Sequence, residues 1–141
     1  MPAHGDVCCS PDSSYTEQEK RNRHAVLAFY EAGVNQRDYA AAFRHLGNRY
    51  TQHNPDAPDG PEGFREFFNL IAQKFPKFRV EIKRVFVDGD MVAVHVRSYD
   101  GPTKNGEAGV DMFRLENGKI VEHWDVIQPI PDRFAHSNGM F

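Results

Sequence analysis

Three ionisable side chains near the C-terminal end lie in segments that otherwise look like core β-strands. They are Asp111, His123 and Asp125, within the stretch 110–127, which is rich in Val, Ile, Phe and Trp. Carboxylates and imidazoles can take up and return protons, and an apolar environment shifts a carboxyl pKa towards neutral pH. We therefore expect this stretch to form the wall of a pocket and to supply its acid–base groups.

The stretch is predicted to be a β-hairpin, because Asn117-Gly118 is a strong turn signal between two strand-like runs. If the turn is a two-residue type I′ turn, Glu116 pairs with Lys119. Asp111 then lies opposite Trp124, on the face away from the other ionisable residues.

A second register follows from a type I turn with a G1 bulge at Gly118. Leu115 then pairs with Lys119, and Asp111 lies directly opposite His123. We favour this register because it gathers the ionisable groups on one face, with Met112, Trp124 and Val126 on the other. The expected pocket face consists of Asp111, Phe113, Val121, His123, Asp125 and Ile127.

Two further histidines are candidates for donating a hydrogen bond to a developing oxyanion, His53 and His95. The alternative for His53, which precedes Asn54-Pro55, is that it is only a turn residue. The alternative for His95, which alternates with valines in a strand-like run, is that it is an ordinary strand histidine without a role in the site. Since no ligand spacing such as HExxH is present, the sequence predicts neither a metal site nor a cofactor.

Helices are expected first along the chain. A capping box formed by Thr16 and Glu19 begins a helix over 17–35. A shorter helix begins at Asp38 and is stopped by Gly47. We expect both to pack through their apolar faces.

A third helix is expected to begin at Pro61 and to end before Pro76, with an unusually aromatic face. Alternating apolar residues then predict strands over 78–87 and 91–99, followed by the hairpin. Because helices precede consecutive antiparallel strands, the order predicts an α+β fold, a curved and mainly antiparallel sheet with three N-terminal helices packed on it.

The composition excludes several classes of function. The 141 residues carry 17 basic and 20 acidic side chains, a net charge of −3, with no basic block of the kind that binds nucleic acid. No apolar run is long enough to span a membrane, so we expect a soluble, cytoplasmic protein. Residues 1–14 are expected to form a disordered tail with Cys8 and Cys9 as free thiols, and residues 15–141 a single domain.

Several segments together resemble the SnoaL-like proteins of the nuclear-transport-factor-like superfamily, which includes ketosteroid isomerases. The resemblance covers nearly everything from about residue 20. The matching segments are Tyr50-Thr-Gln-His-Asn-Pro55, Asp59-Gly60, Glu62-Gly-Phe64, Phe67-Phe68, Asp111-Met-Phe-Arg114, Asn117 to Asp125 and Asn138-Gly-Met-Phe141.

The resemblance implies a cone-shaped, cystatin-like fold with a deep pocket and homodimers formed through the outer face of the sheet. By motif, Asp125 corresponds to the acid–base aspartate of SnoaL-type polyketide cyclases, which use no metal. Asp111 occupies a place similar to that of the protonated aspartate of the isomerases. His53 and His95 lie where the family lines its pocket.

The leading functional hypothesis is therefore a cofactor-independent enzyme that acts next to the carbonyl group of a hydrophobic small molecule. A non-catalytic ligand-binding or protein-interaction module on the same fold is the alternative. An apolar wall is needed to raise the pKa of the base. The residues expected to bind substrate are His123, Trp124, Phe113, Phe64, Phe68 and Tyr50.

Overall fold

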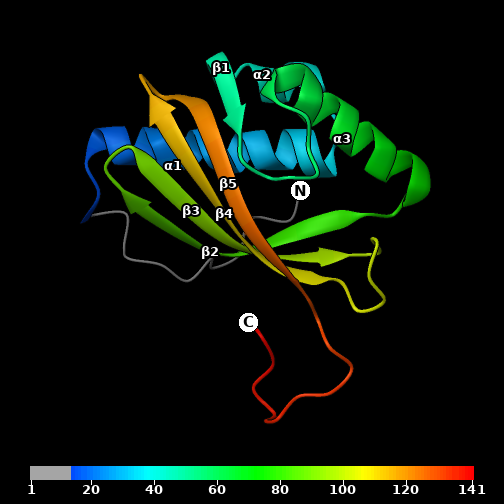
Figure 1. The fold of residues 1–141 in the computed structure, drawn as a ribbon. Helices are drawn as coiled ribbons and strands as arrows, with labels where there is room; N and C mark the ends of the chain where they lie inside the picture. The colour runs from blue at the N-terminus through cyan, green and yellow to red at the C-terminus, as the bar shows by residue number, and fades with distance from the viewer. Residues whose placement is uncertain (1–13) are drawn as a thin grey trace.

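A computed structural model describes residues 14–141 (Figure 1). The elements follow one another as α1 (Glu17–Tyr30), a π-helical turn η2 (Glu31–Asn35), α2 (Tyr39–Phe43), β1 (Leu46–Gln52), α3 (Gly60–Lys74), β2 (Arg79–Asp88), β3 (Met91–Tyr99), β4 (Glu107–Glu116) and β5 (Lys119–Pro129). The expected tail over 1–14 lies, apart from Ser14, outside the described residues, as do Cys8 and Cys9.

The five strands form one curved sheet in the order β1-β5-β4-β3-β2. β1 runs parallel to β5, and the other neighbours are antiparallel. The helices cover one face of the sheet, and the C-terminal segment after β5 loops out on the opposite side (Figure 1). This arrangement confirms the predicted α+β class with its three helices.

α1 begins with the predicted capping box, in which Thr16 Oγ1 accepts from the Glu19 amide and Glu19 accepts from the Thr16 amide. The side chains of Val26 and Phe29, on the apolar side of α1, are fully buried against the sheet. The inward residues of β3, Val92, Val94 and Val96, alternate with outward ones as strand geometry requires. The hydrophobic core therefore lies between the helices and the concave face of the sheet.

Gly47 does not stop a helix, as the sequence had suggested, because α2 ends at Phe43 and Gly47 lies within β1. A Cβ on Gly47 would come within 2.7 Å of Val121 Cγ1 on β5. The glycine is therefore required for the close approach of these two parallel strands.

The predicted Leu115–Lys119 register is wrong. Asn117 and Gly118 both have positive φ, +50° and +73°, and the two-residue turn pairs Glu116 with Lys119. A bulge then occurs at Val121, because Leu115 pairs with Ile120 but the next pair is Arg114–Glu122.

This bulge changes the pairing by one residue and thereby restores the predicted faces. Asp111 lies opposite Asp125, and Phe113 lies opposite His123. Asp111, Phe113 and His123 are buried on the concave side of the sheet. The hairpin thus gathers the three ionisable groups as expected, although by a different register.

Within residues 14–141, no helix is both long and apolar enough to cross a membrane.

Candidate active site

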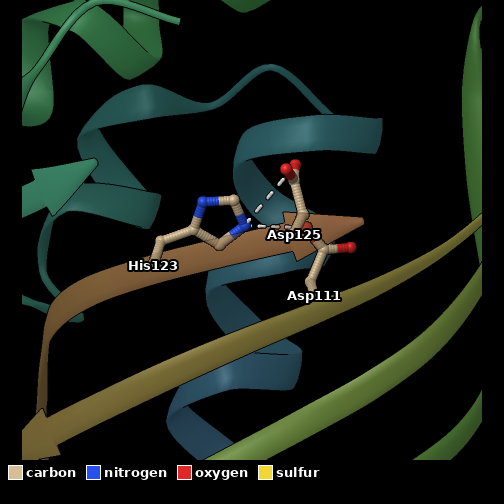
Figure 2. Close-up of side chains that lie close together, drawn as sticks. All are labelled: Asp111, His123 and Asp125. Carbon is tan, nitrogen blue, oxygen red and sulfur yellow. Dashed lines mark hydrogen bonds and ion pairs between the residues drawn. The ribbon is translucent and has the colours of Figure 1, made fainter. Parts of the chain in front are cut away.

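The three ionisable side chains of the hairpin meet on the concave face of the sheet (Figure 2). His123 Nε2 lies 2.7 Å from Asp111 Oδ1 and 4.0 Å from Asp125 Oδ2. The proximity follows from pairing, since Asp111 and Asp125 are cross-strand partners and His123 is two residues from Asp125 on the same face. A single short segment of sheet therefore holds two carboxyl groups and one imidazole.

The orientation of His123 is fixed by Gln52 on β1. Gln52 Oε1 accepts the main-chain N–H of Asn54 at 2.9 Å, which identifies this atom as the amide oxygen. His123 Nδ1 lies 2.7 Å from the same oxygen and must therefore carry a proton. As a result, Nε2 is the nitrogen directed at Asp111, and the two groups share one proton across their 2.7 Å contact.

Two aromatic rings hold the imidazole from its sides. Tyr50 is stacked on His123 at 6.1 Å and 23°, and Phe113 lies 4.9 Å away at 43°. His123 is only 6% exposed, so water does not compete for its ring nitrogens.

The second oxygen of Asp111 accepts a hydrogen bond from the hydroxyl of Tyr30 on α1, at 3.1 Å. Burial, and then the negative charge of Asp111, raises the pKa of Tyr30 well above its ordinary value. The hydroxyl thus stays protonated and acts as a permanent donor. Both oxygens of Asp111 are consequently engaged, one by Tyr30 and one by His123.

Asp125 has a different environment, because within residues 14–141 its one ion-pair contact is the 4.0 Å approach to His123 Nε2, and its close partner is an amide. Asn54 Nδ2 donates to its carboxylate, 2.9 Å from Oδ1 and 2.8 Å from Oδ2. The Asp56 amide donates to Asn54 Oδ1, which fixes the orientation of the Asn54 amide. Burial raises the pKa of Asp125; the Asn54 hydrogen bond partly offsets this, and the charge of Asp111 raises the pKa further.

Two adjoining cavities share part of their walls at these residues. The inner cavity, of about 50 Å³, lies between the helices and the hairpin. The outer cavity, of about 340 Å³, continues towards the far ends of β3 and β4. The residues common to both are Tyr30, Asn54, Phe67, Phe68, Asp111 and Asp125.

Most of the predicted site residues line the inner cavity. His123 lies beside the two aspartates on its wall, and aromatic side chains from β1, α3 and β4 form the apolar remainder. The predicted residues found there are Tyr50, Phe64, Phe68, Asp111, Phe113, His123 and Asp125.

Strand alternation directs His53 and Trp124 away from the cavities. His53 follows the inward-facing Gln52, bonds Glu122 Oε2 at 3.0 Å and stacks on Trp124 at 4.9 Å. Trp124 lies between the inward residues His123 and Asp125, so its side chain is on the convex face. The structure therefore brings neither the predicted oxyanion donor His53 nor the predicted wall residue Trp124 to the site.

His95 is also on the convex face, since its neighbours Val94 and Val96 are the buried residues of β3. Its Nδ1 lies 3.1 Å from Arg84 Nη1, and its ring stacks on Phe141 at 5.3 Å. The sheet separates His95 from the aspartates, so it does not belong to this site.

Three residues of the site were not among the sequence candidates, namely Tyr30, Gln52 and Asn54. Read as a continuing strand, the segment 50–54 has Tyr50, Gln52 and Asn54 on one face, and that alternation is the signal for two of them. Tyr30 reaches Asp111 from 81 positions earlier in the chain and has no local signal.

The three ionisable groups of the site could also be considered as ligands of a metal ion. Asp111, His123 and Asp125 each offer one ligand atom, and these atoms lie within 4.8 Å of one another. Two ligands of a tetrahedral ion with bonds of ~2.1 Å stand roughly 3.4 Å apart. The 2.7 Å contact between His123 and Asp111 instead has the length of a charge-assisted hydrogen bond.

Solved structures share this fold at low sequence identity. A protein assigned as a polyketide cyclase, from Bacillus cereus ATCC 10987, is 21% identical with a TM-score of 0.70, over 82% of this chain and 80% of its own. A SnoaL-like protein assigned as a polyketide cyclase, from Jannaschia sp. CCS1, is 22% identical with a TM-score of 0.68, over 81% and 90%.

A protein assigned as a ketosteroid isomerase, from Kribbella flavida DSM 17836, is 17% identical with a TM-score of 0.66, over 86% of both chains. At these identities the likeness establishes the fold alone. A search of the curated proteins finds no match to this chain.

The family model for the SnoaL-like domain matches residues 26–123, which is more than half of the chain. The match includes the C-terminal end of α1, the Tyr30–Asp111 contact and the hairpin as far as His123. On this basis the protein belongs to the SnoaL-like family.

Proposed function

We propose that this SnoaL-like protein is an enzyme that removes a proton next to the carbonyl group of a hydrophobic small molecule, as in an aldol cyclisation or an isomerisation, without a cofactor. One observation carries the proposal. Asp125 is a carboxylate with a raised pKa on the common wall of two largely apolar cavities, and a proton-holding imidazole–carboxyl pair lies 4.0 Å from it.

Asp125 acts as the general base. It takes the proton from the carbon beside the carbonyl, the C–H electron pair forms a C=C bond, and the carbonyl π electrons move onto oxygen. A base is most effective when its pKa is close to the working pH, and burial moves the pKa of Asp125 in that direction.

The Asp111–His123 pair stabilises the enolate oxygen. The proton between His123 Nε2 and Asp111 Oδ1 is available for donation, because Gln52 holds Nδ1 protonated and Tyr30 supports Asp111. A preorganised donor of this kind is worth up to ~10³-fold in rate. This division of labour resembles other sites in which two carboxyl groups take opposite roles because their environments differ.

Two products follow from the same enolate. Its carbon can attack a second carbonyl of the same molecule, whose oxygen then takes the proton held by Asp125, which gives an aldol product. Alternatively, Asp125 returns the proton to another carbon of the conjugated system, which gives an isomer. The inner cavity is small, so the bulk of the substrate occupies the outer cavity in either case.

The first step can be tested without knowing the natural substrate. Exchange of the methyl protons of 4-acetylbiphenyl in D₂O, followed by NMR, reports proton removal next to a carbonyl. We expect the wild-type protein to catalyse the exchange and Asp125→Asn to lose it. Asp132→Asn is the matched control, because Asp132 is an exposed carboxylate paired with Lys104.

A ligand-binding module without catalysis would give a different result. It would bind 4-acetylbiphenyl equally well with Asp or Asn at position 125, and neither protein would accelerate exchange. Binding measured by calorimetry on both proteins separates this outcome from failure of the probe to enter the cavity.

We also propose that the protein is a homodimer formed through the convex face of the sheet. Large apolar side chains are exposed there on three strands, Phe86 at 57%, Val110 at 41% and Val126 at 70%. Their cross-strand partners on the same face include Ala93 on β3 and His95 beside Val110. A second copy that covers this surface would remove these side chains from water.

A further inference from the structure

The wall of the outer cavity is acidic. Within the described part of the chain, four of the residues that line this cavity have carboxyl groups, and none of the lining residues is Lys, Arg or His. The four are Asp56, Glu107, Asp111 and Asp125. An anionic ligand would be repelled by this wall, whereas a neutral or cationic donor would not.

Glu107 is the carboxyl group furthest from the reacting centre along β4. It is the first residue of that strand and shares the concave face with Asp111, four residues later. At roughly 3.4 Å per residue, the two positions are ~14 Å apart. A substrate that contacts both residues must therefore be elongated.

The carboxylate of Glu107 has no partner in residues 14–141. Its main-chain N–H donates to Ser98 Oγ at 3.0 Å, which ties the start of β4 to β3. No hydrogen bond or ion pair engages the carboxylate itself, and burial raises its pKa. A partly buried acceptor that lacks a partner, and that lines a cavity, is available to a ligand.

Between Glu107 and Asp125 the outer cavity is apolar. Side chains from α3, from the loop after it and from β2, β3 and β5 form this middle section. They are Phe67, Phe68, Ile71, Phe78, Val80, Val96 and Ile127. The cavity thus has a catalytic end, an apolar middle and an acceptor at the far end.

We infer that Glu107 is a specificity-determining residue, which accepts a hydrogen bond from a hydroxyl or protonated amine at the end of the substrate opposite to the reacting carbonyl. The substrate class is an elongated apolar ketone or aldehyde with a donor at its far end and no anionic group there. The inference rests on the proposed function for the position of the carbonyl, but the donor contact itself does not require catalysis.

The test uses four 4-acetylbiphenyl probes that differ only in the 4′ substituent: aminomethyl, hydroxymethyl, methyl and carboxyl. Calorimetry gives the Kd of each for the wild-type protein, Glu107→Gln, Glu107→Leu and the control Glu81→Gln. Glu81 is a carboxylate on the convex face, where it pairs with Lys83, so its replacement leaves the cavity unchanged.

We expect the wild-type protein to bind the aminomethyl and hydroxymethyl probes about tenfold or more tightly than the methyl probe, since hydrogen bonds to charged groups have that magnitude. The carboxyl probe should bind most weakly. Glu107→Leu should abolish the donor preference. Glu107→Gln should retain preference for hydroxymethyl and lose it for aminomethyl, because the amide keeps an acceptor but not the charge.

A donor-to-methyl ratio that stays within twofold between the wild-type protein and Glu107→Leu would overturn the inference, as would no measurable binding of either donor probe. The same four probes with Asp125→Asn separate the two proposals. If exchange persists in Asp125→Asn while the Glu107 preference holds, the proposed base is wrong and the specificity residue stands.

Discussion

A main-chain amide determines where the proton of His123 lies. The Asn54 N–H donates to Gln52 Oε1, so this atom is the amide oxygen. His123 Nδ1 therefore carries the proton that this oxygen accepts. Nε2 is then the nitrogen that faces Asp111. Asn54 also donates through its side chain to Asp125. One residue therefore supports both halves of the proposed acid–base machinery, through two different atoms.

The raised pKa of Asp125 has a consequence for stability. Because the folded-state pKa lies above the unfolded one, the folded protein holds its proton more strongly, and stability decreases as pH rises from the unfolded value through the folded value. Asn at this position has no charge to desolvate. We predict that Asp125→Asn has a higher Tm than the wild-type protein at pH 7, and that the difference shrinks below pH 4.

Thermal unfolding of the two proteins at several pH values measures this effect. A lower Tm of Asp125→Asn at pH 7 would contradict this prediction. It would mean that the Asp125 carboxylate stabilises the fold and has a structural role.

At the scale of elements, the hairpin holds the site because a turn and a bulge act together. The two-residue turn alone would put Asp111 and His123 on opposite faces, and the extra residue at Val121 returns them to one face. The bulge brings Val121 against Gly47 of β1, the strand that also supplies Gln52. The position of Gln52 is therefore coupled to the bulge.

Gly47→Ala tests the close approach of β1 to the bulge. The added Cβ would meet Val121 Cγ1 at 2.7 Å, so we predict a loss of about 1–3 kcal/mol in the free energy of unfolding, measured with denaturant. The double variant Gly47→Ala/Val121→Ala removes the clashing methyl groups and should recover part of the loss. Strict additivity of the two single changes would contradict the close approach as the cause.

Residue type and alternation were sufficient to predict the α+β class and the shared face of His123 and Asp125. Asp111 was predicted on that face from the Leu115–Lys119 register, and it lies there because of a different pairing. The register was not predictable, because Asn117-Gly118 is compatible with either turn and the compensating bulge has no sequence signal of its own. The side on which His95 lies depends on which strand face the helices cover, a tertiary property. Trp124 was expected in the pocket wall, but its position between His123 and Asp125 in an alternating strand already placed it outside.

At the scale of the whole molecule, the sheet has two faces with separate tasks. The concave face, covered by the helices, carries the site, and the convex face exposes apolar side chains on β2, β4 and β5. The C-terminal Phe141 also lies over the convex face, near His95 and Arg97. The catalytic proposal and the dimer proposal therefore concern opposite surfaces and can be tested independently.

We predict a dimer in size-exclusion chromatography with light scattering, and conversion to a monomer by Val126→Glu. Val126 is 70% exposed, and a charge there would be buried without a partner in the interface. Leu70→Glu on α3, at a side chain that is 49% exposed, is the matched control and should remain dimeric. A wild-type protein that is monomeric at all concentrations examined would refute the interface.

The most direct measurement of the proposed function is the rate of methyl-proton exchange of 4-acetylbiphenyl in D₂O, compared between the wild-type protein and Asp125→Asn at equal probe occupancy. General base catalysis contributes ~10²–10⁴-fold, so we predict that the variant loses at least about 10²-fold in exchange rate while its Kd for the probe changes little. Exchange in Asp125→Asn at a rate close to that of the wild-type protein would contradict the assignment of Asp125 as the base.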